Sequence, residues 1–345
     1  MKLLRITNYF LSIFLVVLLI ACSGSGSKKS VEETIQDQPK EIPVNDESQA
    51  LLDYLVELGN YVNSRNIPSL IKVSSVYEEL EGNNLIIDLR DEETYYKGHI
   101  KGAVNVSFSD IPDYMSNTIK PFEYDRIIMV CYAGQIASYT TALLRLIGYG
   151  NVYAMRWGMS AWNKEFANDS WLAVISGEYE DKLETTIHEK AQINDFPKMN
   201  TGKTIGEEIM DERIKAIFEA GYRASMVTAK KVFESPEDYY IINYDRRDKY
   251  EAGHIPGAIR YKPNGTLGIK AEMQTIPADK DIVIYCGTGH NSGFVTAYLR
   301  LFGYNAKTIY YGNNSFMYDK MVEDKSILSW IPFSEAEIED YPFVK

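Results

Sequence analysis

Two related stretches decide the fold of this chain. They read Cys131-Tyr132-Ala133-Gly134-Gln135-Ile136-Ala137 and Cys286-Gly287-Thr288-Gly289-His290-Asn291-Ser292. Each follows a short apolar run, at 127–130 and 282–285, and each opens a segment with helical periodicity. A cysteine therefore stands twice between a predicted buried strand and a predicted helix. We interpret most of the remaining sequence as the scaffold for this loop.

A constant offset relates the two halves of the chain. His99 pairs with His254, Cys131 with Cys286, and Gly148-Tyr149 with Gly303-Tyr304, each at a separation of 155 residues. Self-similarity at one offset is the signature of a duplicated structural unit. The sequence therefore predicts two copies of one domain.

The local patterns predict the same elements in both copies. Apolar runs at 85–87 and 240–242 are typical of short buried strands, and 137–147 and 292–302 are predicted helices, with Gly148 and Gly303 just beyond their ends. An amphipathic helix precedes copy one and 211–221 is its counterpart before copy two. The apolar face of the first helix, behind a cap at Asn45 or Ser48 and before Gly59, is Leu51, Leu52, Leu55, Val56 and Leu58.

Strands that alternate with helices predict α/β domains, each a mostly parallel sheet flanked by helices. We assign residues 1–21 to a signal peptide, 22–45 to a lipidated flexible tether, 46–175 to the first domain and 205–335 to the second. The polar segment 176–204 is predicted to be a connector between the domains.

Composition limits the function. The chain has 345 residues, 45% of them hydrophobic, and a formal net charge of −12, so nucleic acid is not an expected partner. Among the three cysteines, no pair shows the close Cys/His spacing of a zinc site, and no disulfide framework is indicated. We therefore predict no metal and no cofactor.

The N-terminus has the pattern of an export signal. Lys2 and Arg5 precede an apolar run at 10–21, which is short for a membrane-spanning helix. Leu19-Ile20-Ala21-Cys22 resembles the lipobox of bacterial lipoproteins, which implies lipidation at Cys22; an uncleaved anchor or an ordinary signal peptide is the alternative. The polar segment 23–45 is typical of an unstructured tether. The expected location is an exported, membrane-anchored one, facing the periplasm or the cell exterior, and the outer membrane in a Gram-negative cell.

The loop itself suggests nucleophilic chemistry. Backbone N–H groups between a strand and a helix N-terminus converge on one concavity, and the helix dipole adds positive potential there. We expect this environment to lower the pKa of the loop cysteine and to favour a thiolate. Gly134 and Gly289 permit the tight backbone path. The alternative is that each cysteine is simply a small buried residue.

Four motifs in order resemble the rhodanese family, over roughly residues 48–318. In the first copy they are Asp88-Leu89-Arg90, Gly98-His99-Ile100-Lys101-Gly102-Ala103, the Cys131 loop and Arg156-Trp157-Gly158-Met159-Ser160-Ala161-Trp162. The second copy is similar through residues 253–258, the Cys286 loop and, more loosely, 311–316. The resemblance implies that Cys131 and Cys286 carry a sulfane sulfur as a persulfide and pass it to a thiophilic acceptor.

The resemblance also implies which residues bind the substrate. They are the loop residues Tyr132, Ala133, Gly134, Gln135, Ile136, Gly287, Thr288, Gly289, His290 and Asn291. The opening Cys286-Gly287-Thr288-Gly289 is similar to that of mercaptopyruvate-type sulfurtransferases, with Thr288 as a hydrogen-bond donor to substrate or persulfide. His99 and His254, which invite a general-base role, are predicted instead to bond backbone groups in their turns, and Trp157 and Trp162 to pack in the core rather than line a pocket.

Departures from the family pattern concern charge. Thiosulfate-using members place a basic residue five positions after the cysteine, where this chain has Ile136 and Asn291. Charge could come instead from Arg90, Arg156, Arg246, Arg247 or His290, although each is also explained as a surface or structural residue. The cysteine phosphatases have arginine six positions after the cysteine, where Ala137 and Ser292 stand, so phosphate-ester hydrolysis is disfavoured.

Two functions remain open on this basis. One is a sulfurtransferase that takes sulfur from a donor such as thiosulfate or 3-mercaptopyruvate and delivers it to a small sulfur compound or a protein thiol. The other is a non-catalytic binding or redox-sensing lipoprotein that keeps the fold. Ile136 favours the second function and the Gly-Thr-Gly continuation after Cys286 favours the first.

Overall fold

The computed structural model describes residues 46–345, apart from 269–271, 327 and 329. The predicted signal peptide, the lipidation site Cys22 and the tether up to residue 45 lie outside the described residues. Within the described part of the chain, no helix is both long enough and apolar enough to cross a membrane.

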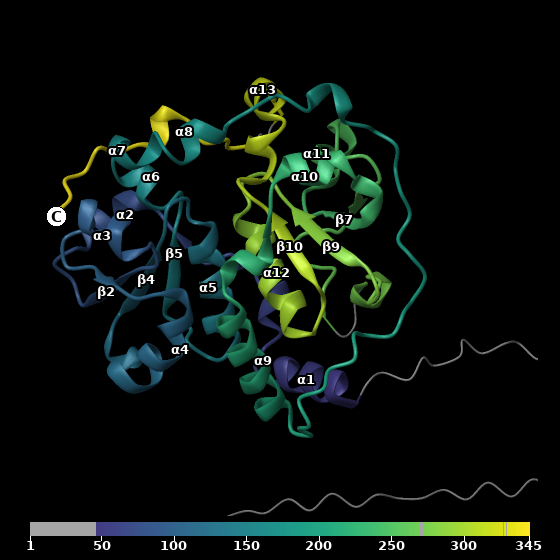
Figure 1. The fold of residues 1–345 in the computed structure, drawn as a ribbon, viewed down its shortest axis with the longest axis horizontal. Helices are drawn as coiled ribbons and strands as arrows, with labels where there is room; N and C mark the ends of the chain where they lie inside the picture. Colours follow the sequence, from purple (N-terminus) through teal and green to yellow (C-terminus); the bar gives the residue numbers. More distant parts are fainter. Residues whose placement is uncertain (1–45, 269–271, 327, 329) are drawn as a thin grey trace, which may run out of the picture. The chain divides into compact units, whose positions relative to one another are not determined.

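Two parallel sheets of five strands form the framework (Figure 1). The first contains β1 (Leu70–Ile71), β2 (Asn84–Asp88), β3 (Val104–Asn105), β4 (Arg126–Val130) and β5 (Val152–Met155) in the order β1-β5-β4-β2-β3. The second contains β6 (Met226–Val227), β7 (Tyr239–Asn243), β8 (Ile259–Arg260), β9 (Asp281–Tyr285) and β10 (Ala306–Ile309) in the order β6-β10-β9-β7-β8. The shared order confirms the predicted fold class of two parallel α/β domains.

Helices cover both faces of each sheet. The first domain has α1 (Asp46–Glu57), α2 (Val73–Glu78), α3 (Glu92–Lys97), α4 (Ile111–Asp113), α5 (Gln135–Leu146), α6 (Met159–Trp162), α7 (Lys164–Ala167) and α8 (Trp171–Val174). The second has α9 (Gly206–Ala220), α10 (Ala229–Glu234), α11 (Arg247–Ala252), α12 (His290–Leu301) and α13 (Tyr318–Glu323). Cover on both faces explains why the central strands β4 and β9 are apolar over consecutive residues.

The helices that follow the cysteines begin two residues earlier than the sequence predicts. Gly134 and Gly289 occupy their N-cap positions in the left-handed region, with φ of 84° and 78°. A residue with a Cβ would be strained there, so the glycines allow the chain to turn directly into α5 and α12. At the other ends, Gly148 and Gly303 also have positive φ, as expected of helix-terminating glycines.

The first helix differs from its predicted apolar face. Leu51, Leu52 and Leu55 are buried, but Val56 and Leu58 are 44% and 47% exposed. Helix α1 ends at Glu57, so Leu58 no longer follows the helical spacing of the other leucines. The counterpart helix α9 begins at Gly206, five residues before the predicted start, and packs against α1.

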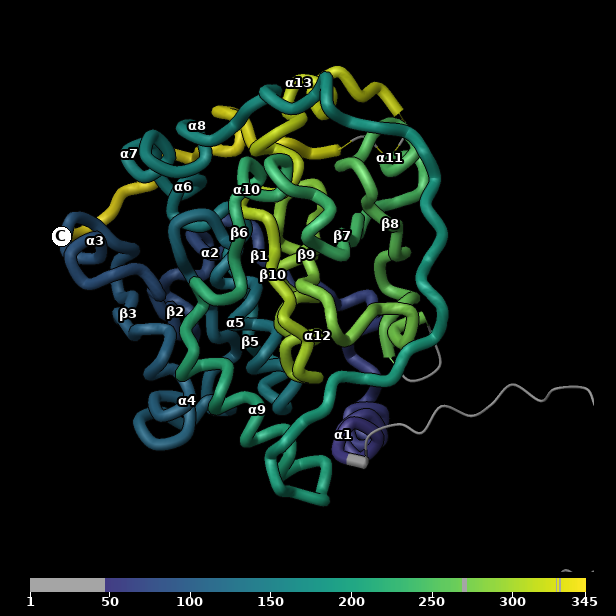
Figure 2. The backbone as a smooth tube through the Cα atoms, turned by 45° about the vertical axis from the view of Figure 1, so that its right-hand side comes forward, coloured from purple at the N-terminus to yellow at the C-terminus, as the bar shows by residue number. Residues whose placement is uncertain are grey.

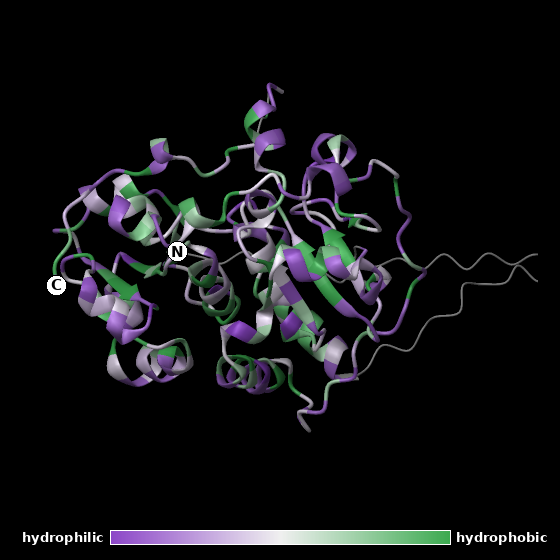
Figure 3. Cartoon of the chain, turned by 45° about the horizontal axis from the view of Figure 1, so that its top comes forward, coloured by the Kyte–Doolittle hydropathy of each residue, from purple (hydrophilic) through white to green (hydrophobic). Residues whose placement is uncertain are grey.

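The two domains share one hydrophobic core. Helices α5 and α12 lie against each other between the sheets (Figure 1), and a single cluster of buried residues extends from Ile127 and Leu143 in the first domain to Ile284 and Phe294 in the second. Figure 3 shows the apolar residues concentrated in the strands and inner helices, with hydrophilic residues on peripheral turns. Because so many apolar side chains are buried between the domains, the domains are held together far more firmly than by a flexible linker alone.

Each domain is followed by a segment that crosses to the other one. After α8, the connector runs along the second domain, where Glu184 and His254 exchange two backbone hydrogen bonds of 2.9 Å (Figure 2). After the second domain, the C-terminal segment returns to the first, where Val344 exchanges the same pair of bonds with His99. The connector is thus bonded to the second domain at several points up to Asn194, and near its end Pro197 and Thr201 bond residues of α1.

A buried ion pair stabilises the turn after β2. Asp88 and Arg90 are 1% and 2% exposed, and the Arg90 guanidinium donates from Nε and Nη2 to the Asp88 carboxylate at 3.0 and 2.6 Å. Nη2 also donates to the carbonyl of Gly98 at 2.7 Å, which links β2 to the turn that carries His99. The second domain has Asn243 and Asp245 in these places, so the pair is specific to the first domain.

Replacing Arg90 by methionine should destabilise the first domain strongly. The Arg90→Met variant leaves the Asp88 carboxylate buried without its cation, which costs about 3–5 kcal/mol in the free energy of unfolding. Urea denaturation followed by circular dichroism measures this loss. Arg247→Met, on an exposed ion pair, is the matched control and should cause no measurable change.

The double variant Asp88→Asn/Arg90→Met tests the cause. It removes both charges and should recover a large part of the lost stability. Equal losses in the single and the double variant would contradict the role of the uncompensated carboxylate.

Candidate active site

Cys131 lies directly after β4, at the carboxyl end of the first sheet, and is 1% exposed. Its Sγ accepts hydrogen bonds from the backbone N–H groups of Gly134 at 3.1 Å and Ala137 at 3.4 Å. The loop therefore wraps around the sulfur and directs N–H dipoles toward it. This arrangement stabilises negative charge on the sulfur relative to a site without donors.

Cys286 occupies the same place after β9 and is 2% exposed. The Ser292 N–H donates to its Sγ at 3.4 Å, and the Cys286 thiol in turn contacts the Ser292 hydroxyl at 3.5 Å. The hydroxyls of Ser292 and Thr308 are 2.7 Å apart. The second sulfur thus has a side-chain hydroxyl beside it that the first one, next to Ala137, does not have.

A further glycine covers each loop. Gly158 and Gly312 follow β5 and β10 with φ of 60° and 55°, and a Cβ at either position would collide with the carbonyl oxygen of Cys131 or Cys286. Each glycine is required by this close approach as well as by its backbone conformation. The predicted motif at 156–162 is therefore part of the first cysteine site.

The two cysteine loops interlock across the domain interface. The Gln135 amide donates to the carbonyl of Ile309 at 3.1 Å and accepts from the N–H of Tyr311 at 2.7 Å, both in the second domain. In the reverse direction, His290 Nε2 faces the N–H of Trp157 in the first domain at 3.4 Å. Gln135 and His290, predicted to bind substrate, are thus the residues that join the two loops in this closed arrangement.

The other loop residues predicted to bind substrate point in different directions. The Tyr132 hydroxyl donates to the Asp91 carboxylate at the start of α3, away from the sulfur. Ile136 is buried in the shared core, and the carbonyl of Ala133 accepts from the Trp171 indole at 3.1 Å. Thr288 accepts from His290 Nδ1 at 2.8 Å, because Nε2 already accepts from Trp157. Gly287, Gly289 and half-buried Asn291 complete the second loop.

The expectation of acidic thiols is wrong for these closed loops. Burial raises the pKa of Cys131 above its ordinary value, although the loop N–H groups oppose the shift. Burial also raises the pKa of Cys286, and the charge of Asp245 adds to the increase. The sequence pattern predicts the backbone N–H donors, which lower the thiol pKa, but not the burial, which raises it. The prediction therefore included only the smaller of the two effects on the pKa.

Comparisons with known proteins agree with this geometry. The model of the rhodanese-like domain matches residues 72–165 and 228–318, which together make up more than half of the chain. The chain belongs to the rhodanese-like family. The two matched segments contain the two cysteine loops, so both sites lie within rhodanese-like domains.

The similar proteins match different lengths of this chain. A thiosulfate sulfurtransferase from Pseudoalteromonas translucida is 31% identical over 99 residues, which are 28% of this chain and 90% of that protein. A tRNA uridine(34) hydroxylase from Teredinibacter turnerae is 28% identical over 33% of this chain, and the chain spans only 40% of that protein's length. Among solved structures, the thiosulfate sulfurtransferase from Pseudomonas aeruginosa is 15% identical with a TM-score of 0.28, over 84% of this chain and 49% of that one.

The rhodanese-like turns place their histidines as predicted. Nδ1 of His99 and of His254 lies 3.0 and 2.7 Å from the backbone carbonyl four residues earlier. The two predicted core tryptophans, Trp157 and Trp162, are buried. The Trp157 indole donates to Glu337 at 2.8 Å.

Most of the predicted sources of positive charge do not serve the cysteines. Arg90 is paired with Asp88, and the exposed pair Arg246 and Arg247 bonds acidic residues of α11. Burial lowers the pKa of His290 to about 3, and the nearby Arg156 charge contributes, so this imidazole is neutral. Of the predicted sources only Arg156 is then left, and it is half-buried with its guanidinium over the Trp157 ring.

Asp245 is the functional-site residue that sequence reasoning missed. It accepts from the Gly287 N–H at 3.4 Å and from the Asn313 amide at 3.3 Å, so its carboxylate adjoins the Cys286 loop. Burial raises the pKa of Asp245 to about 6. The signal was present in the sequence, since Asp245 stands at the repeat position of Arg90, with the opposite charge. Its effect depends on a contact that the sequence does not show.

Neutralising Asp245 should make Cys286 more reactive. In Asp245→Asn the negative charge beside the loop is removed, so the Cys286 pKa falls and its thiolate fraction near pH 7.5 rises by about 3- to 10-fold. Rates of reaction with a dipyridyl disulfide, measured by peptide mass spectrometry, report this change. Below a pH of about 6 Asp245 is protonated in the native protein, so the two proteins should converge there.

Asp248→Asn is the matched control, because its exposed carboxylate pairs with Arg246 and makes no contact with the Cys286 loop. It should leave the Cys286 rate unchanged. An Asp245→Asn variant that reacts no faster than the native protein above pH 7 would contradict the electrostatic role of Asp245.

Proposed function

We propose that this chain is a sulfurtransferase that carries a sulfane sulfur as a persulfide on Cys131 and Cys286. The observation that carries the proposal is the pair of cysteine sulfurs at the carboxyl ends of β4 and β9, each accepting loop N–H groups. The same donors suit the terminal sulfur of a persulfide, which is anionic and one bond longer than the thiolate. Membership of the rhodanese-like family supports this chemistry.

The proposed reaction has two displacements. The cysteine thiolate attacks the outer sulfur of the donor, the new S–S bond forms, and the donor's former bond to that sulfur breaks with release of sulfite or of the carbon fragment bearing the electron pair. A thiophilic acceptor then attacks the terminal sulfur of the persulfide. The Cys–S bond to that sulfur breaks and the thiolate is regenerated.

Donor selection in this proposal follows from the interface. Both thiols are buried and the loops interlock through Gln135 and His290, so substrate entry requires the two loops to separate. Ile136 and Asn291 add no positive charge, whereas a charge-assisted contact is worth about 1.5–3 kcal/mol. The missing contact weakens the binding of an anionic donor. The donors we propose, thiosulfate or 3-mercaptopyruvate, rest on the family membership, with a small sulfur compound or a protein thiol as acceptor and Thr288 available at the second site.

A second candidate is a binding or redox-sensing module without turnover. Burial raises the pKa of both thiols, and the Asp245 charge raises that of Cys286 further. Thiols of this kind react slowly until the structure opens. That observation favours a sensor whose cysteines are exposed by separation of the loops.

Intact-mass spectrometry separates the two functions. In a Cys22→Ser background the chain has two thiols, Cys131 and Cys286. After incubation with thiosulfate or 3-mercaptopyruvate, we expect a gain of one sulfur mass at each active cysteine, removed by excess dithiothreitol and by the Cys131→Ser or Cys286→Ser substitution. Absence of an adduct with either donor, at thiols that an alkylating reagent does modify, would favour the sensing function.

We also propose that the protein is exported and held on a membrane by lipid on Cys22, in the outer membrane of a Gram-negative cell. The support is the sequence at 2–22, in which basic residues, an apolar run and Leu-Ile-Ala-Cys follow one another. The polar segment 23–45 would then separate the rhodanese-like domains from the lipid surface.

Fractionation of a bacterial host tests the anchor. The native chain should be recovered with membranes and gain the mass of a diacylglyceryl group on Cys22 after removal of residues 1–21. Cys22→Ser should lose this modification and the cleavage that depends on it, whereas Cys131→Ser should keep both. Recovery of the unmodified native chain in the soluble fraction would contradict the proposal.

A further inference from the structure

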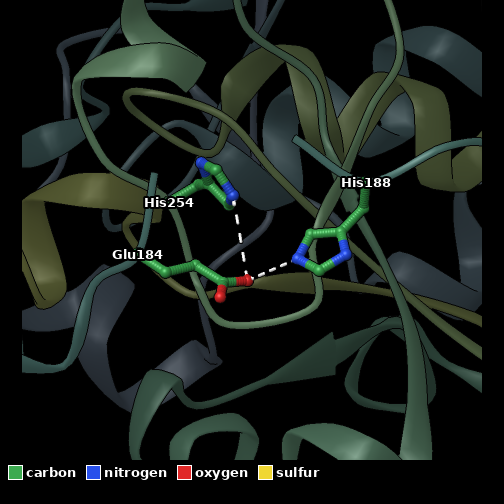
Figure 4. Close-up of side chains that lie close together, drawn as sticks. All are labelled: Glu184, His188 and His254. Carbon is green, nitrogen blue, oxygen red and sulfur yellow. Dashed lines mark hydrogen bonds and ion pairs between the residues drawn. The ribbon is translucent and has the colours of Figure 1, made fainter. Parts of the chain in front are cut away.

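A cluster of ligand-type side chains lies where the connector meets the second domain. Glu184 and His188 come from the connector and His254 from the turn before β8, and one nitrogen or oxygen atom of each lies within 4.8 Å of the others (Figure 4). His254 is fully buried, while Glu184 and His188 are half-buried. The cluster is separate from the cysteine loops and has no part in the proposed sulfur chemistry.

Both ring nitrogens of His254 face oxygen acceptors. Its Nδ1 lies 2.7 Å from the Tyr250 carbonyl, and a proton on this nitrogen would be donated to that oxygen. A neutral ring then has a lone pair on Nε2, but Nε2 faces the Thr186 carbonyl at 2.9 Å and the Glu184 carboxylate at 3.9 Å. Both of these oxygens are acceptors. Either a second proton or a metal ion must therefore occupy this side of the ring.

The known separations of the donor atoms can be compared with those around a tetrahedral metal ion. Metal–ligand bonds of about 2.0–2.1 Å place neighbouring ligand atoms about 3.3 Å apart. Here the His188 Nε2 to Glu184 Oε1 distance is 2.7 Å, and the two contacts of His254 Nε2 are 2.9 and 3.9 Å. These three separations lie within about 0.6 Å of that value, and the donor atoms of Glu184, His188 and His254 all lie within 4.8 Å of one another.

We propose that Glu184, His188, His254 and the Thr186 carbonyl form a structural zinc site. Two imidazoles and two oxygens are a donor set that suits a borderline divalent ion such as Zn²⁺. The Tyr250 carbonyl orients His254 through Nδ1, as outer hydrogen bonds commonly do for ligating histidines. The Gly257 N–H holds the Glu184 carboxylate at 2.6 Å.

The first domain shows that the turn does not need this donor set. His99 has the same bond to a preceding carbonyl, and its ring stacks on Tyr95 with centroids 3.8 Å apart, as His254 stacks on Tyr250. The segment paired with His99 contributes Val344, which has no ligand atom in its side chain. Glu184 and His188 are therefore additions at one copy of a shared turn.

A metal ion at this place would attach the connector to the second domain. Three ligands come from residues 184–188 of the connector and the fourth from the buried turn before β8. The ion would therefore fix the connector to the second domain. Binding to the folded protein alone would stabilise it in proportion to the logarithm of free zinc concentration.

Metal content and thermal stability of the full chain test the site. After chelator treatment and dialysis against Zn²⁺, we expect one zinc per chain by elemental analysis. The melting temperature should rise by about 4–8 °C at zinc about 100 times above the dissociation constant. His188→Ala and Glu184→Gln should abolish both effects. Glu189→Gln, on an exposed neighbouring carboxylate, should retain them.

Two results would overturn the proposal. One is zinc uptake that is absent, or equal in the native chain and in His188→Ala. The other is a nitrogen NMR spectrum of His254, recorded with excess zinc, that shows protons on both ring nitrogens, because the cation would then be a proton. Neither readout depends on sulfur transfer, so the outcome is independent of the function proposed for the cysteines.

Discussion

The packing of α5 against α12 is the contact on which the rest of the structure depends. These helices start at the cysteine loops, so pressing them together brings both loops to one interface and removes both thiols from solvent. Gln135 and His290, the first residues of the two helices, then bond the backbone of the opposite domain. The two copies of the fold thereby share a core between them and have paired sites, rather than being two independent domains.

Burial at this interface changes the electrostatics of the thiols. Loop N–H groups favour the thiolate, but removal of water opposes it more strongly, and Asp245 opposes it again at Cys286. The two sites are therefore alike in backbone and different in charge. In the first domain the corresponding position is Arg90, whose charge is compensated by Asp88. The duplicated backbone carries two electrostatic environments, which is a route to separate roles for two copies of one site.

The segments that follow each domain also join the two domains. The connector pairs with His254 and the C-terminal segment pairs with His99, so each histidine turn is completed by the chain that follows the opposite domain. Opening of the cysteine interface must leave these two attachments in place or strain them. The cluster of Glu184, His188 and His254 lies at the connector's attachment. The attachment of Val344 to His99 has no ligand side chain from the paired segment, so a metal ion could stabilise only the first of the two.

Local sequence was sufficient for the fold class and for the position of the cysteines. Apolar strands and helical periodicity are patterns of neighbouring residues, and the 155-residue offset is visible in the sequence itself. Glycines such as Gly134 and Gly148 indicate positions where the backbone has a positive φ. The exact starts of α5 and α9 and the exposure of Val56 and Leu58 were not predictable, because they depend on which neighbour covers each face.

Tertiary structure alone decided the properties of the site. The raised thiol pKa values, the contact of Asp245 with the Cys286 loop and the bonds of Gln135 all depend on groups brought together from distant parts of the chain. The same holds for the cluster in which His254 lies 66 or more residues along the chain from Glu184 and His188. The sequence by itself determined a repeated α/β scaffold with a cysteine after each central strand. Burial and the long-range contacts determined how each cysteine is charged, covered and joined to the other, because desolvation and electrostatics depend on distance in space.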